Sequence, residues 1–153
     1  MAKGGVEDRD LGWKEIKKEL AKFKKMGVKV GIVEGHNISE SGANIAEYAD
    51  YNEEGTKDIP SRPFIRSWVD GNRERIYRVA DSAFNSVVSG RRTAEDAMKL
   101  IGEFAQSGIK KNISDGGFES NKPSTVKRKG SSKPLIDNGT MRNAIRYEVV
   151  NKK

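Results

Sequence analysis

The chain has no cysteine, a single histidine and only four prolines among its 153 residues. Without cysteine it forms neither disulfides nor thiolate metal sites, and no thiol can act as a nucleophile. One histidine rules out metal sites built on a histidine pair and leaves little from which to build a catalytic triad. No apolar run approaches the roughly 18 residues that cross a bilayer, and the first ten residues lack the apolar segment of a secretory signal. We therefore expect a basic binding or assembly protein of the cytoplasm, with no cofactor and no membrane partner.

Positive charge is in excess, and it is unevenly placed. Lysine and arginine total 29 against 22 aspartates and glutamates, which gives a net charge of +7. Residues 31–60 nevertheless carry seven acidic side chains and one basic side chain, a net charge of −6, whereas the rest of the chain is basic. Such asymmetry favours contact between complementary surfaces and does not dictate the fold. A solvated acidic segment is the alternative interpretation.

Hydrophobic periodicity predicts several helices. Apolar side chains recur at helical spacing in four segments: 10–26, 44–53, 64–90, and from 93 onward. Gly27 is expected to end the first helix, and Gly71 to break or kink the third. Thr93 and Asp96 resemble a capping box at the start of the fourth, which is the firmest of these predictions.

Two short segments predict strands, and together with the helices they indicate the fold class. Residues 28–33 alternate in polarity, and residues 146–150 place Tyr147 and Val149 on one face. The order helix, strand, several helices, strand predicts one α+β domain over residues 1–153. Its small antiparallel or mixed sheet would be packed by two to three long helices. Residues 1–9 are expected to be flexible and 34–43 to form a loop.

A long segment near the C-terminal end combines flexibility with positive charge. Residues 114–134 have almost no apolar side chains, so the sequence predicts a long, flexible, basic loop. The loop contains the run Lys127, Arg128 and Lys129, which could approach phosphates and release counterions. This run is a candidate for contact with DNA or with a partner ring, and a merely solvated run is the alternative. Aromatic side chains do not alternate with the cations, so base-specific recognition is not expected.

The segment 59–68, IPSRPFIRSW, resembles an interface anchor. Pro60 and Pro63 restrict the backbone, and Arg62 and Arg66 flank the aromatic Phe64. Arginine and aromatic side chains are enriched at the energetic centres of protein interfaces. The alternative is that Phe64 and Trp68 enter the core while both arginines stay outside, and the two interpretations are compatible.

Two segments resemble signatures of tailed-phage neck and tail-completion proteins. Residues 47–66, EYADYNEEGTKDIPSRPFIR, are similar to "NEFGT…IPARPFLR", and residues 133–145, KPLIDNGTMRNAI, are similar to "KPLIDTGxLRxSI". The group spans the siphophage tail-component family and the Mu-type virion morphogenesis family, and the resemblance covers roughly residues 28–150. Matching positions are Asn52, Glu53, Gly55, Thr56, Ile59, Pro60, Arg62, Pro63, Phe64, Arg66, Pro134, Leu135, Ile136, Asp137, Gly139, Arg142 and Ile145.

The second segment keeps the features of a turn despite its departures from the signature. Asn138 replaces the usual threonine, but asparagine still suits a turn or a helix cap. Ala144 replaces a serine, and in the first segment Glu54 replaces the usual aromatic residue. The residues expected to form the structural turn motif are Pro60, Pro63, Asp137, Asn138, Gly139 and Arg142.

The resemblance implies a structural virion protein of the neck or tail, and not an enzyme. Such a protein forms a ring around the DNA channel and helps attach the tail to the filled head. A hexamer is expected, with a twelve-fold ring as the alternative, and neighbouring neck, connector or tail-terminator proteins as partners. Non-specific contact with genomic DNA in the channel is also implied. Residues expected at the subunit or partner interface are Glu53, Glu54, Arg62, Phe64 and Arg66.

A free-standing basic nucleic-acid-binding protein is the alternative function. The net charge of +7 and the run at 127–129 favour it. A third reading, a small nuclease or lytic enzyme, has no recognisable acid–base or metal constellation to support it.

Overall fold

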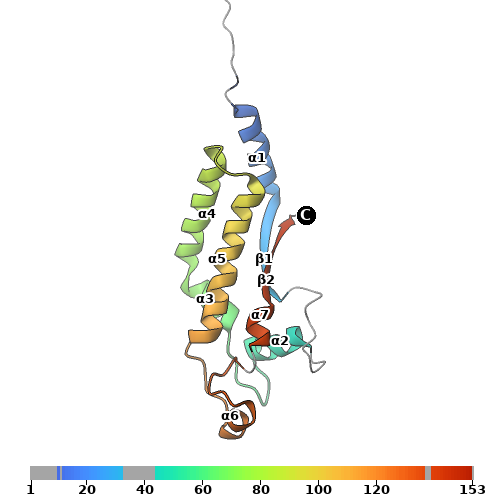
Figure 1. The fold of residues 1–153 in the computed structure, drawn as a ribbon, viewed down its shortest axis with the longest axis vertical. Helices are drawn as coiled ribbons and strands as arrows, with labels where there is room; N and C mark the ends of the chain where they lie inside the picture. Colours follow the sequence, from blue (N-terminus) through green and yellow to red (C-terminus); the bar gives the residue numbers. More distant parts are fainter. Residues whose placement is uncertain (1–9, 11, 33–43, 137–138, 153) are drawn as a thin grey trace, which may run out of the picture.

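The computed structural model describes residue 10 and residues 12–32, 44–136 and 139–152 (Figure 1). Its elements follow the order α1 (Trp13–Lys25), β1 (Met26–Ile32), α2 (Ile45–Glu54), α3 (Phe64–Gly71), α4 (Arg73–Val88), α5 (Ala94–Asp115), α6 (Pro123–Lys129), α7 (Thr140–Ala144) and β2 (Ile145–Asn151). This arrangement confirms the α+β class. Among the described residues, no helix combines the length and the apolar character needed to cross a membrane.

The sheet consists of β1 and β2, which pair in antiparallel fashion. Its inner face carries the apolar side chains of three directly opposed pairs, Val28 with Val149, Val30 with Tyr147, and Ile32 with Ile145. On the alternate positions, Lys29 lies opposite Glu148, and both are exposed. This alternation explains why the sequence pattern of period two identified both strands.

Helices α5 and α4 form successive layers on one side of this sheet. The long helix α5 contacts both strands, α4 packs against α5, and α1 contacts both of these helices (Figure 1). Gly102 of α5 allows the close approach, because a Cβ there would overlap the ring of Tyr147. Gly108, two turns further on, gives the same room to the indole of Trp68 in α3. The prediction that two to three long helices pack the sheet is thus met, among the described helices, by α5 alone in direct contact with both strands, with α4 packed on α5.

The buried side chains form two clusters along α5. The larger contains Phe64, Ile109 and Ile145, each about 1% exposed or less, and joins α3, α5 and β2. The smaller contains Ala83, Val87 and Ala97 under the side chains of Leu20 and Phe23 from α1. Burying each large apolar side chain stabilises the fold by roughly 1.5–3 kcal/mol. The larger cluster is therefore what holds the two predicted motif segments onto the helical layers.

Helix ends follow the local chemistry of the sequence. The Thr93 hydroxyl oxygen accepts a hydrogen bond from the Asp96 backbone N–H at 3.1 Å, which confirms the predicted cap of α5. Glu19 of α1 accepts from the Ala94 N–H at 2.7 Å, so a second carboxylate serves the same helix start. At the α3–α4 junction, Gly71 is the last residue of α3, as its predicted break requires.

Gly27 does not end α1, contrary to the prediction. The backbone is already extended at Met26, with φ −99° and ψ 160°, so α1 ends at Lys25 and leads directly into β1. Gly27 lies within β1, opposite Val150. Pairing with β2 extends the strand two residues before the alternating pattern begins, because backbone hydrogen bonds do not require alternating side chains.

The predicted flexible loop over 114–134 is wrong at its start and in its middle. Helix α5 continues to Asp115, and residues Pro123–Lys129 form α6. Pro123 occupies the first turn of α6, and Gly130 ends it in the left-handed conformation with φ 68°. Proline and glycine are common in loops, but in this segment they mark the two ends of a helix. The predictions for residues 1–9, 34–43, Asp137 and Asn138 lie outside the described residues.

Candidate functional site

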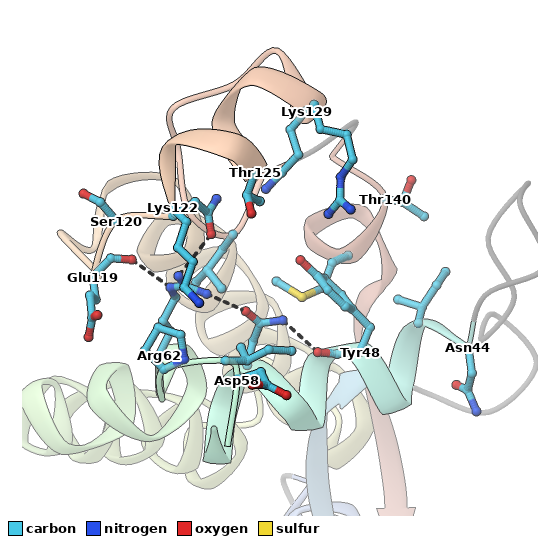
Figure 2. Close-up of a pocket in the computed structure, with 18 residues that line it drawn as sticks. Asn44, Tyr48, Asp58, Arg62, Glu119, Ser120, Lys122, Thr125, Lys129 and Thr140 are labelled. Carbon is cyan, nitrogen blue, oxygen red and sulfur yellow. Dashed lines mark hydrogen bonds between the residues drawn. The ribbon is translucent and has the colours of Figure 1, made fainter. Parts of the chain in front are cut away.

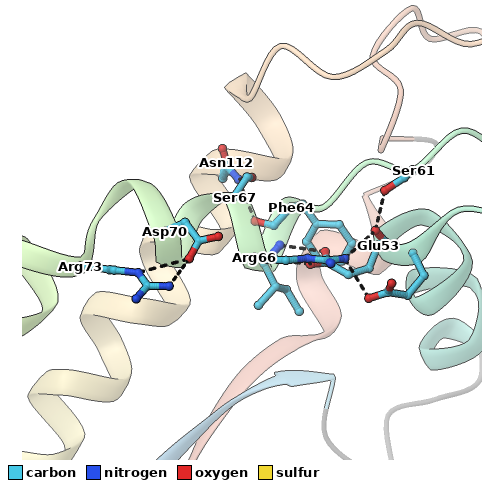
Figure 3. Close-up of polar contacts among 10 residues, drawn as sticks. Glu53, Ser61, Phe64, Arg66, Ser67, Asp70, Arg73 and Asn112 are labelled. Atoms are coloured by element: carbon cyan, nitrogen blue, oxygen red, sulfur yellow. Dashed lines mark hydrogen bonds and ion pairs between the residues drawn. The ribbon is translucent and has the colours of Figure 1, made fainter.

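The junction between α2 and α3 is organised by carboxylates at the end of α2. Glu53 accepts hydrogen bonds from the backbone N–H groups of Ile65 at 2.9 Å and Arg66 at 2.8 Å (Figure 3). Pro63 precedes α3 and offers no side-chain cap, so the Glu53 carboxylate takes over that role from another helix. The Arg66 guanidinium in turn donates to Glu54 at 2.9 Å. Glu53, Glu54 and Arg66 thus act as one polar cluster.

The predicted interface residues fall into an exposed group and a buried group. Glu54 and Arg66 are exposed, with 62% and 54% of their side chains accessible. Phe64 is 1% exposed and belongs to the core, so its side chain cannot contact a partner. The alternative interpretation, in which Phe64 enters the core, is therefore correct for this residue. Asn112 of α5 donates to the Phe64 carbonyl at 2.7 Å and fixes that backbone as well. An interface role for Glu54 and Arg66 stays a prediction.

Arg62 is buried, contrary to the expectation that it stays outside. Only 4% of the residue is exposed. Its Nε donates to the Glu119 carbonyl at 2.8 Å, and its two terminal nitrogens donate to the side-chain oxygens of Asn52 at 3.1 Å and Asn121 at 3.0 Å (Figure 2). The Arg62 backbone N–H also donates to the Asn52 carbonyl at 2.6 Å. A single guanidinium therefore joins the end of α2 to the segment that precedes α6.

All three acceptors of this guanidinium are uncharged. Asn52 is itself 1% exposed and is held by a hydrogen bond from its amide to the Tyr48 carbonyl at 2.8 Å. Asn121 donates to the Pro134 carbonyl at 3.2 Å. No ion pair within the described part of the chain involves Arg62. A buried cation without a carboxylate partner leaves positive potential in its surroundings, because protein screens charge less than water does.

A cavity of about 440 Å³ opens beside Arg62, between α2 and α6 (Figure 2). Ile45, Tyr48, Ile59, Pro60, Leu135 and Met141 supply its apolar lining. Four basic residues, Arg62, Lys122, Arg128 and Lys129, and two acidic residues, Asp58 and Glu119, also line it. The remaining lining residues are Asn44, Asn52, Ser120, Asn121, Thr125 and Thr140. Mixed apolar and polar lining at this volume is typical of sites that bind a ligand or a side chain.

The basic run at 127–129 divides between this cavity and the outer surface. Arg128 and Lys129 line the cavity, and Lys129 donates to the Pro134 carbonyl at 3.2 Å. Lys127 is exposed and is not part of the lining. Successive residues of a helix point about 100° apart, so α6 cannot present all three cations to one ligand. The sequence pattern indicates a loop in this segment, and in a loop all three cations could approach the same ligand.

The predicted turn motif is described in part. Pro60 lines the cavity, and Pro63 precedes the first turn of α3. Gly139 has φ 81°, a left-handed conformation that suits glycine, and stands just before α7. Arg142 donates to the Lys110 carbonyl at 3.3 Å and so ties α7 to α5. Burial, followed by the nearby positive charges of Arg146 and Arg142, lowers the pKa of Lys110.

Several residues that shape the cavity were not singled out from the sequence. Asn52 matches a position of the first motif. Its buried hydrogen bond with Arg62 could not be predicted, because it depends on how the end of α2 packs against the following turn. Asn121 and Lys122 lie in the predicted loop, and nothing in that stretch marks them. A signal was available in Pro123, since proline is common in the first turn of a helix and indicated that α6 begins there.

Large apolar side chains are also exposed on the helical side of the molecule. Tyr77, Phe84 and Val88 of α4 are 67%, 41% and 39% exposed, and Trp13 of α1 is 56% exposed. Residues 77, 84 and 88 are separated by seven and four positions, so they share one face of α4. Phe84 also contacts Phe23 of α1, with 5.8 Å between ring centroids. This face is a second candidate surface for binding a protein.

Metal chemistry finds no support in the described residues, which contain no group of three metal-ligating side chains. Comparison with protein-family models, with curated proteins and with solved structures found no match to this chain. The functional assignment therefore depends on the cavity, the charged clusters and the exposed helical face.

Proposed function

We propose that the chain is a structural virion protein of a tailed phage, acting at the head–tail joint as a neck or tail-completion component. It assembles into a ring around the DNA channel, with neighbouring neck, connector or tail-terminator proteins as partners. The virion is its final location and the host cytoplasm its place before assembly. In this proposal it works by binding other proteins and not by catalysing a reaction.

The observation that carries this proposal is the meeting of the two motif segments in space. Asn52, Ile59 and Arg62 from the first segment and Leu135 and Met141 from the second line the same cavity. Residues far apart in the chain therefore combine into one surface feature, which supports reading the two segments as parts of one site. The two segments also share the larger core cluster through Phe64, Leu135 and Ile145.

The exposed surfaces support assembly with copies of the same chain. A closed ring uses heterologous contacts, in which one patch of a subunit meets a different patch of its neighbour. The exposed apolar face at Tyr77, Phe84 and Val88 is one such patch. The exposed lysines of α1 and the acidic side chains around Glu54 provide patches of opposite charge. We propose that residues 31–60 of one subunit meet the basic side of α1 in the next.

Native mass spectrometry of the purified chain at low and at high ionic strength tests this proposal. We expect a closed oligomer, a hexamer or a twelve-fold ring, that weakens as salt screens the charged contacts. Tyr77→Ser with Phe84→Ser should shift the oligomer toward monomer, whereas Arg78→Ala, a matched exposed change on α4, should leave it intact. A chain that stays monomeric at every concentration, and also with its neighbouring neck proteins, would contradict the proposal.

A free-standing nucleic-acid-binding protein is the second candidate. The exposed cations of α6, Lys127 and Arg128, favour it. Fluorescence anisotropy with duplex DNA at two salt concentrations separates the two functions. Tight binding by the isolated subunit, with an affinity that falls steeply with salt, would favour the nucleic-acid-binding protein.

A further inference from the structure

The cavity between α2 and α6 has a lining suited to an anionic ligand with an apolar part. Four cationic residues contribute to it against two acidic ones, Asp58 and Glu119. Among the described residues, the ion pairs include none formed by Arg62, Lys122 or Arg128. The positive charges of these three residues are therefore not paired directly with a carboxylate in the described part of the chain.

The buried guanidinium of Arg62 is the main reason to expect an anion. It is 4% exposed, and its three hydrogen bonds go to two amide oxygens and one backbone carbonyl. A guanidinium has five N–H donors, so these bonds leave donor capacity beside the cavity that Arg62 lines. A carboxylate is the group that best satisfies a buried guanidinium, because both charge and fork geometry match.

The rest of the lining narrows the class of ligand. Tyr48, Ile59, Leu135 and Met141 offer apolar surface next to the cationic groups. A volume of about 440 Å³ accommodates a few side chains and falls in the range of small-ligand pockets. Two acidic residues, Asp58 and Glu119, offset part of the positive charge of the lining, which favours a ligand with few negative charges over the closely spaced phosphates of a DNA backbone.

We propose that this cavity binds an acidic segment of a partner polypeptide, one in which an apolar side chain adjoins a carboxylate. The apolar side chain lies against Ile59, Leu135 and Met141, and the carboxylate lies toward Arg62 and Arg128. The inference rests on the proposed function in that it gives an assembly protein a docking site. It concerns a site within one subunit and does not require the ring.

Methyl NMR of the full chain with labelled methionine side chains tests the site directly. The probe is a short synthetic peptide that carries Glu-Leu-Glu in a Gly/Ser background. Met141 lines the cavity, whereas Met98 is buried elsewhere at 5% exposure, so the two methyl groups report on the site and on the rest of the fold. We expect the Met141 signal to shift in a saturable manner and the Met98 signal to stay in place. Methyl groups remain observable in large assemblies, so the test works for a monomer and a ring alike.

Matched peptides and variants define the chemistry. A Gln-Leu-Gln peptide removes the charge, and a Glu-Gly-Glu peptide removes the apolar group; both should bind about tenfold more weakly or not at all. Lys122→Gln combined with Arg128→Gln should lower the affinity for the Glu-Leu-Glu peptide about tenfold. Lys127→Gln removes a charge from the same helix outside the lining and should change the affinity less than about twofold.

Three results would overturn the inference. The first is no shift of Met141 with the Glu-Leu-Glu peptide at any concentration. The second is an equal loss of affinity in Lys127→Gln and in the double variant, which would mean a diffuse electrostatic effect. The third is stronger binding of inorganic phosphate or duplex DNA than of the peptide at the same site. Because peptide binding is read on the subunit, it can fail while the ring is still observed, and ring formation can fail while the peptide still binds.

Discussion

Replacing Arg62 with alanine should remove a large part of the stability of this fold. The change deletes three hydrogen bonds from a charged donor, with lengths of 2.8, 3.1 and 3.0 Å. Bonds of this kind contribute about 1.5–3 kcal/mol each, so their sum has an upper limit of about 9 kcal/mol. Water in the adjoining cavity can replace some of them, but it reaches the oxygen of Asn52, which is 1% exposed, much less easily. We therefore expect a loss of about 3–5 kcal/mol, against a typical total of about 5–15 kcal/mol.

Urea unfolding followed by tryptophan fluorescence measures this loss, with the midpoint and the slope analysed separately. Measurements at several protein concentrations are needed, because subunit assembly would add to the apparent stability. Arg78→Ala is the control: this arginine is 74% exposed, pairs with Glu74, and should cost less than about 1 kcal/mol. A loss for Arg62→Ala no larger than that of the control would refute the reasoning.

A double-mutant cycle identifies the partner through which Arg62 acts. Asn52→Ala removes the buried acceptor, so its cost and that of Arg62→Ala should overlap by about 1 kcal/mol or more when the two changes are combined. Additive costs would mean that the hydrogen bond between the two side chains contributes little and that Arg62 acts mainly through Glu119 and Asn121.

Two further predictions concern Gly108 of α5 and Glu19 of α1, whose carboxylate accepts a hydrogen bond at the start of α5. Gly108→Ala should destabilise the fold by about 1–2 kcal/mol and shift the Trp68 fluorescence, because the new Cβ overlaps the indole and this outweighs the better helix propensity of alanine; a stabilised variant would contradict this. The hydrogen bonds from Lys22 and Ala94 lower the pKa of Glu19 below its ordinary value of 4.5. The ionised carboxylate therefore contributes to the free energy of unfolding above that pH, and this contribution is lost as pH falls through the lowered pKa. The difference in unfolding free energy between the wild type and Glu19→Gln should therefore shrink on acidification, whereas a constant difference would contradict the assignment.

The regular parts of the fold could be predicted because their signals are local. The apolar stripes of α1, α4 and α5, the cap at Thr93 and the alternation in both strands each depend on neighbouring residues. The missed element, α6, has no buried residue and no apolar stripe, so periodicity could not reveal it. Its two ends were nevertheless marked by Pro123 and Gly130.

The candidate site was predictable only in its components. Arg62, Arg128 and Lys129 were each singled out, but as parts of an exposed turn and a loop. Their common cavity depends on Arg62 turning inward to the Glu119 carbonyl, 57 positions away in the chain. A contact of that range has no signature in composition or spacing, because it is decided by how the segment preceding α6 lies against the turn between α2 and α3.

The pairing of β1 with β2 has a consequence for the order in which the chain folds during its synthesis. Strand β1 follows the first helix directly, but its partner follows six further helices, α2 to α7. While the ribosome makes those helices, the inner face of β1 has no second strand beside it, and closing so long a loop is slow. Helices α4 and α5 can pair early through local contacts, whereas the sheet forms only when Ile145–Asn151 has emerged. Strand β2 therefore completes the sheet late, after the helices that cover it have been made.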